Sequence, residues 1–395
     1  MKKRIFISLF IATMVAMLGV GVIEPILPLY AKSMNATGIE LGIIFAGFAL
    51  ARGIFAPIIG QFSDEHGRKK LIIAGLIFFI ILSICYVFAS DPLALTIIRT
   101  VQGFSTVLVT AVAQAYVGDI TPIGKEGKYM NLFFMSFFGG QALGPYLGGY
   151  LSDQYNMKFP FYAMAILSTL ALILILFFVS ESMATKKRKR EHVPLFKSLV
   201  PVYKDKPMRG IMTYMFSRGF YRWGFNTFFP ILAVKAASIS LTNVGLILSA
   251  YMLSGAFIQY PSGLAVDKYP AKKNKFILIG GITSAVAMCI IGYFDSVWMF
   301  VLLTVIMGVF SSVSRASAVA IRTERGRIFG MGAATGAFTA SISFGQVLGP
   351  IIFGVIADFF SIPTAFVFGG VIGLIGTTMA YIHLKAEANS SETEI

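Results

Sequence analysis

Charged side chains are scarce in this sequence: they make up 13% of its 395 residues, about half the share usual in soluble proteins. Apolar residues make up 56%, and the mean hydropathy is +0.78. A soluble fold of this size has too little polar surface to cover so much apolar material. The few charges lie mostly between long apolar runs, which predicts an integral membrane protein.

Residues that carry enzymatic or metal chemistry are also few. Cys85 and Cys289 both lie within apolar runs, and the three histidines, His66, His192 and His383, are dispersed. This pattern predicts neither a disulfide framework nor a metal cluster. The sequence contains no P-loop, no soluble domain for ATP hydrolysis and no recognisable pair of nucleophile and base. We therefore expect no enzymatic activity and no cofactor.

The apolar runs divide the chain into twelve predicted spans, each near the 20 residues or so that cross a bilayer. The first run continues to Tyr30 and contains Glu24 and two prolines, so we interpret it as a span and not as a secretory signal. The predicted spans are residues 5–30, 38–62, 70–90, 93–117, 129–150, 161–179, 210–234, 241–266, 276–294, 297–320, 329–358 and 364–382.

Lysine and arginine are unevenly distributed between the two sides. With both termini in the cytoplasm, cytoplasmic segments hold 25 of the 33, and the outer segments hold only Lys32, Lys158 and Lys235. This asymmetry predicts that orientation in the cell membrane. It also explains the net charge of +15 without nucleic-acid binding.

The longest interruption between spans predicts the domain boundaries. We expect an N-terminal six-helix bundle at 1–181, a cytoplasmic linker at 182–209, a C-terminal bundle at 210–384 and a tail at 385–395. The basic run Lys186–Arg190 is typical of a solvated topogenic linker, and attraction to anionic lipid is the alternative. Linker and tail are both predicted to be mobile.

The two halves repeat one another. Gly140–Pro145 (GQALGP) recurs as Gly345–Pro350 (GQVLGP), and Asp153 matches Asp358 at the same offset of 205 residues. A second match, at an offset of 203, joins Gly60, Asp64, Lys69 and Lys70 to Gly263, Asp267, Lys272 and Lys273. An all-α membrane fold of two pseudo-symmetric six-helix bundles is predicted.

One loop resembles a motif of the major facilitator superfamily. Residues 60–70 (GQFSDEHGRKK) are similar to that family's loop between the second and third spans. The resemblance implies a cytoplasmic gate that latches the two halves in the outward-facing state, formed by Gly60, Asp64, Gly67 and Arg68, with Asp119 joining it. We expect Asp64 to accept hydrogen bonds from Arg68 and the two glycines to allow close packing and a tight turn. An ordinary hydrated loop is the alternative.

A second motif is similar to the fifth-span signature associated with drug antiporters, as distinct from symporters and facilitators. It is Gly139–Gly149 (GGQALGPYLGG), and it implies antiport without naming a substrate. Small residues let helices approach closely, and proline bends a span. The packing residues expected in the two repeats are Gly140, Gly144, Pro145, Gly148, Gly149, Gly349 and Pro350.

Two further segments resemble family motifs. Residues 19–30 (GVGVIEPILPLY), which contain Glu24, are similar to the first-span motif of twelve-span drug antiporters. Residues 95–103 (LTIIRTVQG), which contain Arg99, are similar to the fourth-span motif of proton-driven members. Glu24 is a candidate proton carrier, or else a residue of the outer mouth that is wetted or paired with arginine. Arg99 requires an anionic or carbonyl partner inside the membrane, and either proton coupling or structural hydrogen bonding would explain it.

Further arginines complete the candidate site for substrate and protons. Arg52, Arg218, Arg222 and Arg315 lie in apolar spans, and Arg218 and Arg222 share a helix face. They favour an anionic, zwitterionic or phosphate-bearing substrate, unless they cap helix ends. Nearby aromatic residues either line an adaptable pocket or pack against lipid and helices; Tyr221 and Trp223 are the chosen candidates.

These features together predict a secondary active transporter. The leading hypothesis is proton-coupled export of small amphipathic compounds by alternating access. The alternatives are a specific carrier for an anionic metabolite or lipid-like molecule, and a receptor that keeps the fold without transporting. We expect small-molecule, proton and lipid partners and a monomer, although no sequence feature names the substrate or the oligomeric state.

Overall fold

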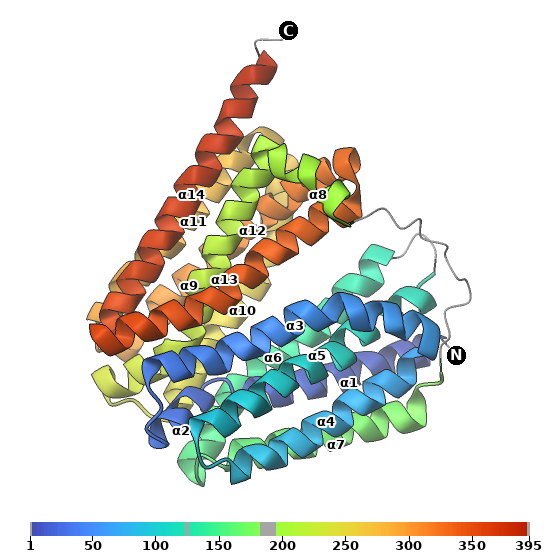
Figure 1. Ribbon diagram of the computed structural model, residues 1–395, viewed down its shortest axis with the longest axis vertical. Helices are drawn as coiled ribbons and strands as arrows, with labels where there is room; N and C mark the ends of the chain where they lie inside the picture. Colours follow the sequence, from blue (N-terminus) through green and yellow to red (C-terminus); the bar gives the residue numbers. More distant parts are fainter. Residues whose placement is uncertain (1, 123–125, 182–194, 393–395) are drawn as a thin grey trace. The chain divides into compact units, whose positions relative to one another are not determined.

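The computed structural model describes residues 2–122, 126–181 and 195–392, which form helices and connecting turns without any strand (Figure 1). Twelve of the helices are long. They are α1 (Lys2–Val22), α3 (Gly38–His66), α4 (Arg68–Phe88), α5 (Pro92–Ile120), α6 (Glu126–Gln154), α7 (Phe159–Phe178), α9 (Lys206–Ala237), α10 (Leu241–Lys268), α11 (Lys273–Ile290), α12 (Val297–Phe329), α13 (Met331–Phe359) and α14 (Ile362–Glu392).

Short elements accompany them. α2 (Leu27–Ser33) continues the first span after a break, and α8 (Leu195–Lys204) precedes α9. The 3-10 turns Pro270–Lys272 and Ile291–Tyr293 flank α11. The twelve predicted spans thus coincide with the long helices, apart from the break in the first span.

Ten of the described helical segments are long and apolar enough to cross a membrane. The two long helices outside that set are α6 and α9. Both contain residues of low hydropathy: the glycine-rich segment Gly139–Gly149 lies in α6, and Arg218 and Arg222 lie in α9. Hydropathy alone therefore identifies ten of the twelve long described helices as candidate spans.

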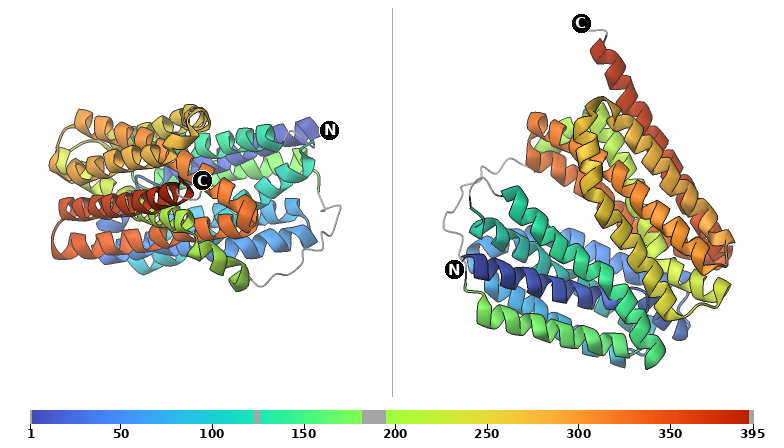
Figure 2. Two further views of the ribbon diagram at one scale, coloured as in Figure 1. Left: turned by 90° about the horizontal axis from the view of Figure 1, so that it is seen from above. Right: turned by 180° about the vertical axis from the view of Figure 1, so that it is seen from behind.

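The structure divides into two compact units, one comprising residues 1–188 and 233–249 and the other residues 189–232 and 250–395. In the first unit α1 packs against α6 and α7, α3 packs against α5, and α4 packs against α5 and α7 (Figures 1 and 2). In the second, α11 packs against α12 and α14, and α13 packs against both of these helices.

Glycines mark close helix contacts in both units. A methyl group at Gly144 in α6 would lie within 2.7 Å of the Leu18 carbonyl oxygen in α1. At the corresponding place of the repeat, a methyl group at Gly349 in α13 would overlap the Phe220 carbonyl oxygen in α9. The repeat in the sequence is therefore also a repeat of helix packing.

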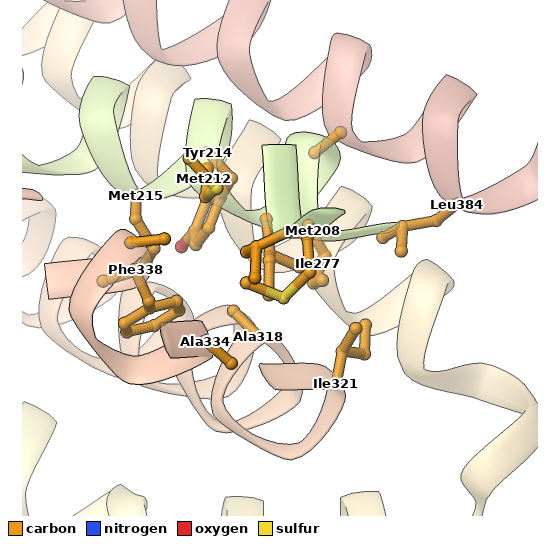
Figure 3. Close-up of a cluster of buried hydrophobic side chains, with 14 residues drawn as sticks. Met208, Met212, Tyr214, Met215, Ile277, Ala318, Ile321, Ala334, Phe338 and Leu384 are labelled. Carbon is orange, nitrogen blue, oxygen red and sulfur yellow. The ribbon is translucent and has the colours of Figure 1, made fainter. Parts of the chain in front are cut away.

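The second unit contains a buried apolar cluster (Figure 3). Val202 of α8 is fully buried in this cluster, and α8 packs against α12 and α13. The final part of the predicted linker is therefore packed structure, which corrects the expectation of a mobile segment. The basic run Lys186–Arg190 lies outside the described residues. The members of the apolar cluster are Val202, Met208, Ile211, Met212, Tyr214, Met215, Ile277, Ala318, Ile321, Ala334, Ala337, Phe338, Ala380 and Leu384.

Candidate functional site

The first span is interrupted at a carboxylate. α1 ends at Val22 and α2 begins at Leu27, with Glu24 in the turn between them. Pro25 has no N–H group to continue the hydrogen bonds of α1, and Pro28 suits the first turn of α2. The break therefore follows from the local sequence, and it leaves Glu24 half-buried.

Side chains from two other helices approach this carboxylate. Gln141 Nε2 in α6 donates a hydrogen bond to Glu24 Oε1 at 3.0 Å. Arg52 in α3 is close enough for the charge of Glu24 to act on it. Of the two interpretations drawn from the sequence, this geometry fits a paired carboxylate; its role as a proton carrier stays a prediction.

Arg99 in α5 is 2% exposed and has neutral partners. Its Nη1 donates to Gln102 Oε1 at 2.7 Å, and the Tyr86 hydroxyl donates to the same oxygen at 2.9 Å. The rings of Phe45 and Phe48 lie 5.2 and 4.5 Å from Arg99 Cζ. Within the described part of the chain no carboxylate pairs with Arg99, so the required carbonyl partner is an amide oxygen.

The remaining candidate arginines gather in the second unit. Arg218 and Arg222 project from α9, and their charges act on Arg315 in α12. Arg222 Cζ lies 5.8 Å from the centre of the Tyr251 ring in α10. Tyr221 is buried and lies within electrostatic reach of Arg218 and Arg222.

Trp223 is half-buried beside this group of arginines in the sequence, and it makes contacts of its own. Arg52 and Glu24 belong to the first unit, whereas Arg218, Arg222 and Arg315 belong to the second. The predicted site residues therefore form two groups, one in each compact unit.

The predicted gate residues are anchored within the first unit. Arg68, at the start of α4, pairs with Asp119 at the end of α5: Nη2 donates to Oδ1 at 3.1 Å, and Nε pairs with Oδ2. Gly67 has a φ of +89°, a conformation that favours glycine, and a methyl group there would lie 2.9 Å from Glu181 Oε1. The tight turn predicted at Gly67 is therefore present.

The expectations for Gly60 and Asp64 of this loop are not confirmed. A methyl group at Gly60 would meet no atom within 4 Å among the described residues, so close packing does not explain this glycine. Asp64 lies in the last turn of α3, but its side chain is outside the described part, and its bond to Arg68 stays a prediction.

The glycines of α6 face different neighbours. Methyl groups at Gly140 and Gly148 would overlap carbonyl oxygens of α1, those of Met14 and Val22. A methyl group at Gly149 would instead overlap the Leu241 carbonyl oxygen at the start of α10. Pro145 and Pro350 both lie inside helices, α6 and α13. One motif thus serves two helix contacts.

Sequence patterns identify candidate side chains more readily than the residues that bind them. Gln141 stands out in the sequence only as part of the repeated GQALGP segment, yet in the structure it donates a hydrogen bond to Glu24. Glu181 accepts a hydrogen bond from the Lys69 amide at 2.9 Å at the start of α4. Asp153 accepts hydrogen bonds from the start of α10, and its match to Asp358 in the repeat was the available signal.

Known proteins resemble this chain over nearly its whole length. An uncharacterised MFS-type transporter of Methanocaldococcus jannaschii is 28% identical over 98% of this chain and 99% of its own. Multidrug resistance protein 2 of Bacillus subtilis is 25% identical over 98% of this chain and 97% of its own. Quinolone resistance protein NorA of Staphylococcus aureus is 25% identical over 91% of each chain.

The fold itself matches a solved transporter and a family model. The nucleoside transporter NupG superposes with a TM-score of 0.82, at 13% identity, over 96% of this chain and 99% of that one. The model of the Major Facilitator Superfamily matches residues 9–238 and 211–394. This chain therefore belongs to the major facilitator superfamily of multi-pass membrane transporters, and it is a transporter and not an enzyme.

Proposed function

We propose that this transporter exports small amphipathic compounds across the cell membrane in exchange for protons. The names of two relatives, a multidrug and a quinolone resistance protein, support export of such compounds. The fifth-span motif Gly139–Gly149 supports antiport. The physical basis of coupling is a carboxylate whose protonation changes how helices attract one another.

The main support for this proposal is the position of Glu24 and the contacts that its carboxylate makes. It lies where α1 and α2 meet, it accepts a hydrogen bond from Gln141 in α6, and its charge acts on Arg52 in α3. When Glu24 is ionised, Arg52 has a counter-charge in the first unit. When a proton binds to Glu24, that attraction is lost, because the neutral carboxyl group no longer offsets the positive charge of Arg52.

Proton binding would therefore favour a different arrangement of α1, α3 and α6. α6 also contacts the start of α10 through Gly149 and Asp153, so a shift of α6 reaches a helix of the second repeat. A two-state element biased by both proton and substrate is what antiport requires. Glu24 acts as the proton-binding group, and Gln141 and Arg52 act as its positioning partners.

The test compares wild type with Glu24→Gln in proteoliposomes that carry a fluorescent pH indicator inside. A panel of cationic, neutral and anionic amphiphiles is added, and substrate-induced proton movement is recorded. Asp295→Asn is the matched control, because Asp295 is an exposed carboxylate in the turn before α12. We expect proton movement in wild type and in Asp295→Asn, and none in Glu24→Gln.

Proton movement that persists in Glu24→Gln would reject Glu24 as the carrier. Substrate uptake that is indifferent to an imposed pH gradient in wild type would reject proton exchange altogether. Glu24→Gln protein that still exchanges unlabelled for labelled substrate would support the assignment, because exchange needs the binding site but no net proton transfer.

A further inference from the structure

The middle of α9 holds two arginines, of which Arg218 is buried and Arg222 is half-buried. Arg222 lies 16 residues after Lys206 and 15 before Ala237, and Arg218 lies one helical turn earlier on the same face. Arg218 is 3% exposed. Arginine at such depth is tolerated where it has a partner or serves a function.

Polar atoms around these arginines lack partners. The Nε atoms of Arg218 and Arg222, the Tyr221 hydroxyl and the Asn226 carbonyl oxygen are buried without a hydrogen-bond partner among the described residues. All four side chains lie on α9 within nine residues. Buried polar groups are nearly always satisfied in native proteins, so these groups are available to hydrogen-bond a polar ligand.

The neighbouring charges increase the need for an anion. Arg315 and Arg322 in α12 are further cations, and the charges of Arg218, Arg222 and Arg322 all act on Arg315. Within the described ranges, no hydrogen bond or ion pair joins Arg218 or Arg222 to a carboxylate. Like charges in a low-dielectric environment repel strongly, and a bound anion relieves that repulsion.

The aromatic neighbours suit the rest of a small ligand. Arg222 lies over the Tyr251 ring, and Tyr214 and Tyr221 are buried within electrostatic reach of Arg218. A stacked ring orients a guanidinium group but does not neutralise it, so the guanidinium donors remain available. Guanidinium groups bind carboxylates and phosphates through paired hydrogen bonds.

We propose that Arg218 and Arg222 bind an anionic group of the transported substrate, a carboxylate or a phosphate, with the surrounding tyrosines contacting its apolar body. This inference rests on the proposed transport function, since it assigns the chemical class of the compound that is moved. The substrate would be an amphipathic anion. It would bind in the second unit, whereas the proton would bind to Glu24 in the first unit.

Binding is measured separately from transport, in the full-length chain carrying Trp298→Phe. This substitution removes an 82% exposed tryptophan and leaves Trp223, next to Arg222, as the single fluorescent reporter. The protein is placed in phosphatidylcholine nanodiscs and titrated with phenyl phosphate, benzoate, benzyl alcohol and benzylammonium. The probes share a ring and differ in charge.

We expect saturable fluorescence changes with phenyl phosphate and benzoate, and none with benzyl alcohol or benzylammonium. Arg218→Gln and Arg222→Gln should each weaken anion binding roughly tenfold or more, the loss of one charged hydrogen-bonded contact. Arg209→Gln, which removes an exposed arginine from the same helix, should bind as wild type does. The thermal unfolding midpoint of the ligand-free Arg218→Gln protein should stay level or rise, because an uncompensated buried charge is removed.

Several results would overturn the inference. These are no anion binding in wild type, equal binding of benzylammonium, or unchanged affinity in Arg218→Gln. Nanodiscs containing phosphatidylglycerol test a lipid phosphate as the occupant: stabilisation by that lipid without any response to the soluble anions would also overturn it. If Arg218→Gln does not fold, the inference is still tested by the anion affinity of Arg222→Gln and by the response of wild type to the four probes. Anion binding without proton movement would preserve this inference and reject the proposed proton exchange.

Discussion

Asp153 holds Thr242 by two hydrogen bonds: the backbone amide and the hydroxyl of Thr242 donate to Asp153 Oδ2 at 2.7 and 2.6 Å. The Leu241 amide donates to Oδ1 at 3.1 Å. Amides in the first turn of a helix have no partner inside the helix, so Asp153 of α6 caps α10 from outside. The carboxylate thus joins a helix of the first repeat to a helix of the second.

Removing this cap should destabilise the start of α10. Asp153 is exposed and its hydrogen bonds are screened by solvent, so Asp153→Asn should lower the free energy of unfolding by only ~0.5–1 kcal/mol. The measurement is the thermal unfolding midpoint in detergent at pH 7, which should fall. Partial burial raises the pKa of Asp153, but the hydrogen bonds from Thr242 and Leu241 outweigh it and the pKa is lowered overall.

The lowered pKa determines the pH dependence of the effect. Because the folded chain binds the proton less readily than the unfolded chain, the stabilisation is fully present above a pH of about 4 and is lost as the pH falls further. The difference between wild type and Asp153→Asn should therefore be constant from pH 8 to 5 and shrink below pH 4. Asp295→Asn should show no such difference, and an equal effect in both variants would contradict the capping role.

Neighbouring glycines in α6 provide a test of helix packing. A methyl group at Gly140 would overlap the Met14 carbonyl oxygen, whereas one at Gly139 would meet no atom of the described residues within 4 Å. Gly140→Ala should destabilise the protein by ~1–3 kcal/mol through overpacking. Gly139→Ala should be neutral or stabilise by up to about 1 kcal/mol, because alanine favours helix. Thermal unfolding of the two variants, measured side by side, decides; equal midpoints would refute the assigned contact with α1.

Two ion pairs that join a helix start to a later helix should differ in strength. Arg68 pairs with Asp119 in the first unit, and Lys273 pairs with Glu324 in the second. The Arg68 and Asp119 side chains are 5% and 29% exposed, against 13% and 54% for the second pair.

The more buried pair, which also has two contacts, should be the stronger. Double-mutant cycles with Arg68→Gln and Asp119→Asn should give a coupling of ~1–2 kcal/mol. The cycle with Lys273→Gln and Glu324→Gln should give less than ~0.5 kcal/mol, and this smaller coupling should vanish in 1 M salt. A larger coupling in the second pair would mean that burial does not control these contacts.

Arg99 is predicted to be a structural residue of α5. Arg99→Gln removes the charge that bonds Gln102 and stacks on Phe45 and Phe48, so the unfolding midpoint should fall by an amount equivalent to ~1–3 kcal/mol. Proton movement per folded molecule should be retained in proteoliposomes. A normal midpoint with lost proton movement would instead assign Arg99 to coupling. The control is Thr304→Ala, because Thr304 lies 205 residues after Arg99, at the matching position of the repeat, and carries no charge.

Much of the architecture was predictable because the bilayer limits what a chain of this composition can do. Twelve apolar stretches of the required length became twelve long helices, and the offset of 205 residues between Gly144 and Gly349 became the same helix contact in both units. Local sequence also determined the break beside Glu24 and the turn at Gly67, since proline and glycine act on their own backbone.

Pairings between distant residues were decided only in the tertiary structure. Glu24 and Gln141 are 117 positions apart, and a sequence pattern with periods of a few residues contains no information on which side chains meet across such a distance. Arg99 illustrates the consequence: its type and depth required a partner, but packing selected the neutral Gln102 oxygen over a carboxylate. The sequence by itself determined the helices and the candidate residues, because length, hydropathy and backbone chemistry are local. Helix packing determined which of those residues act together, because hydrogen bonds and charges reach only a few ångströms.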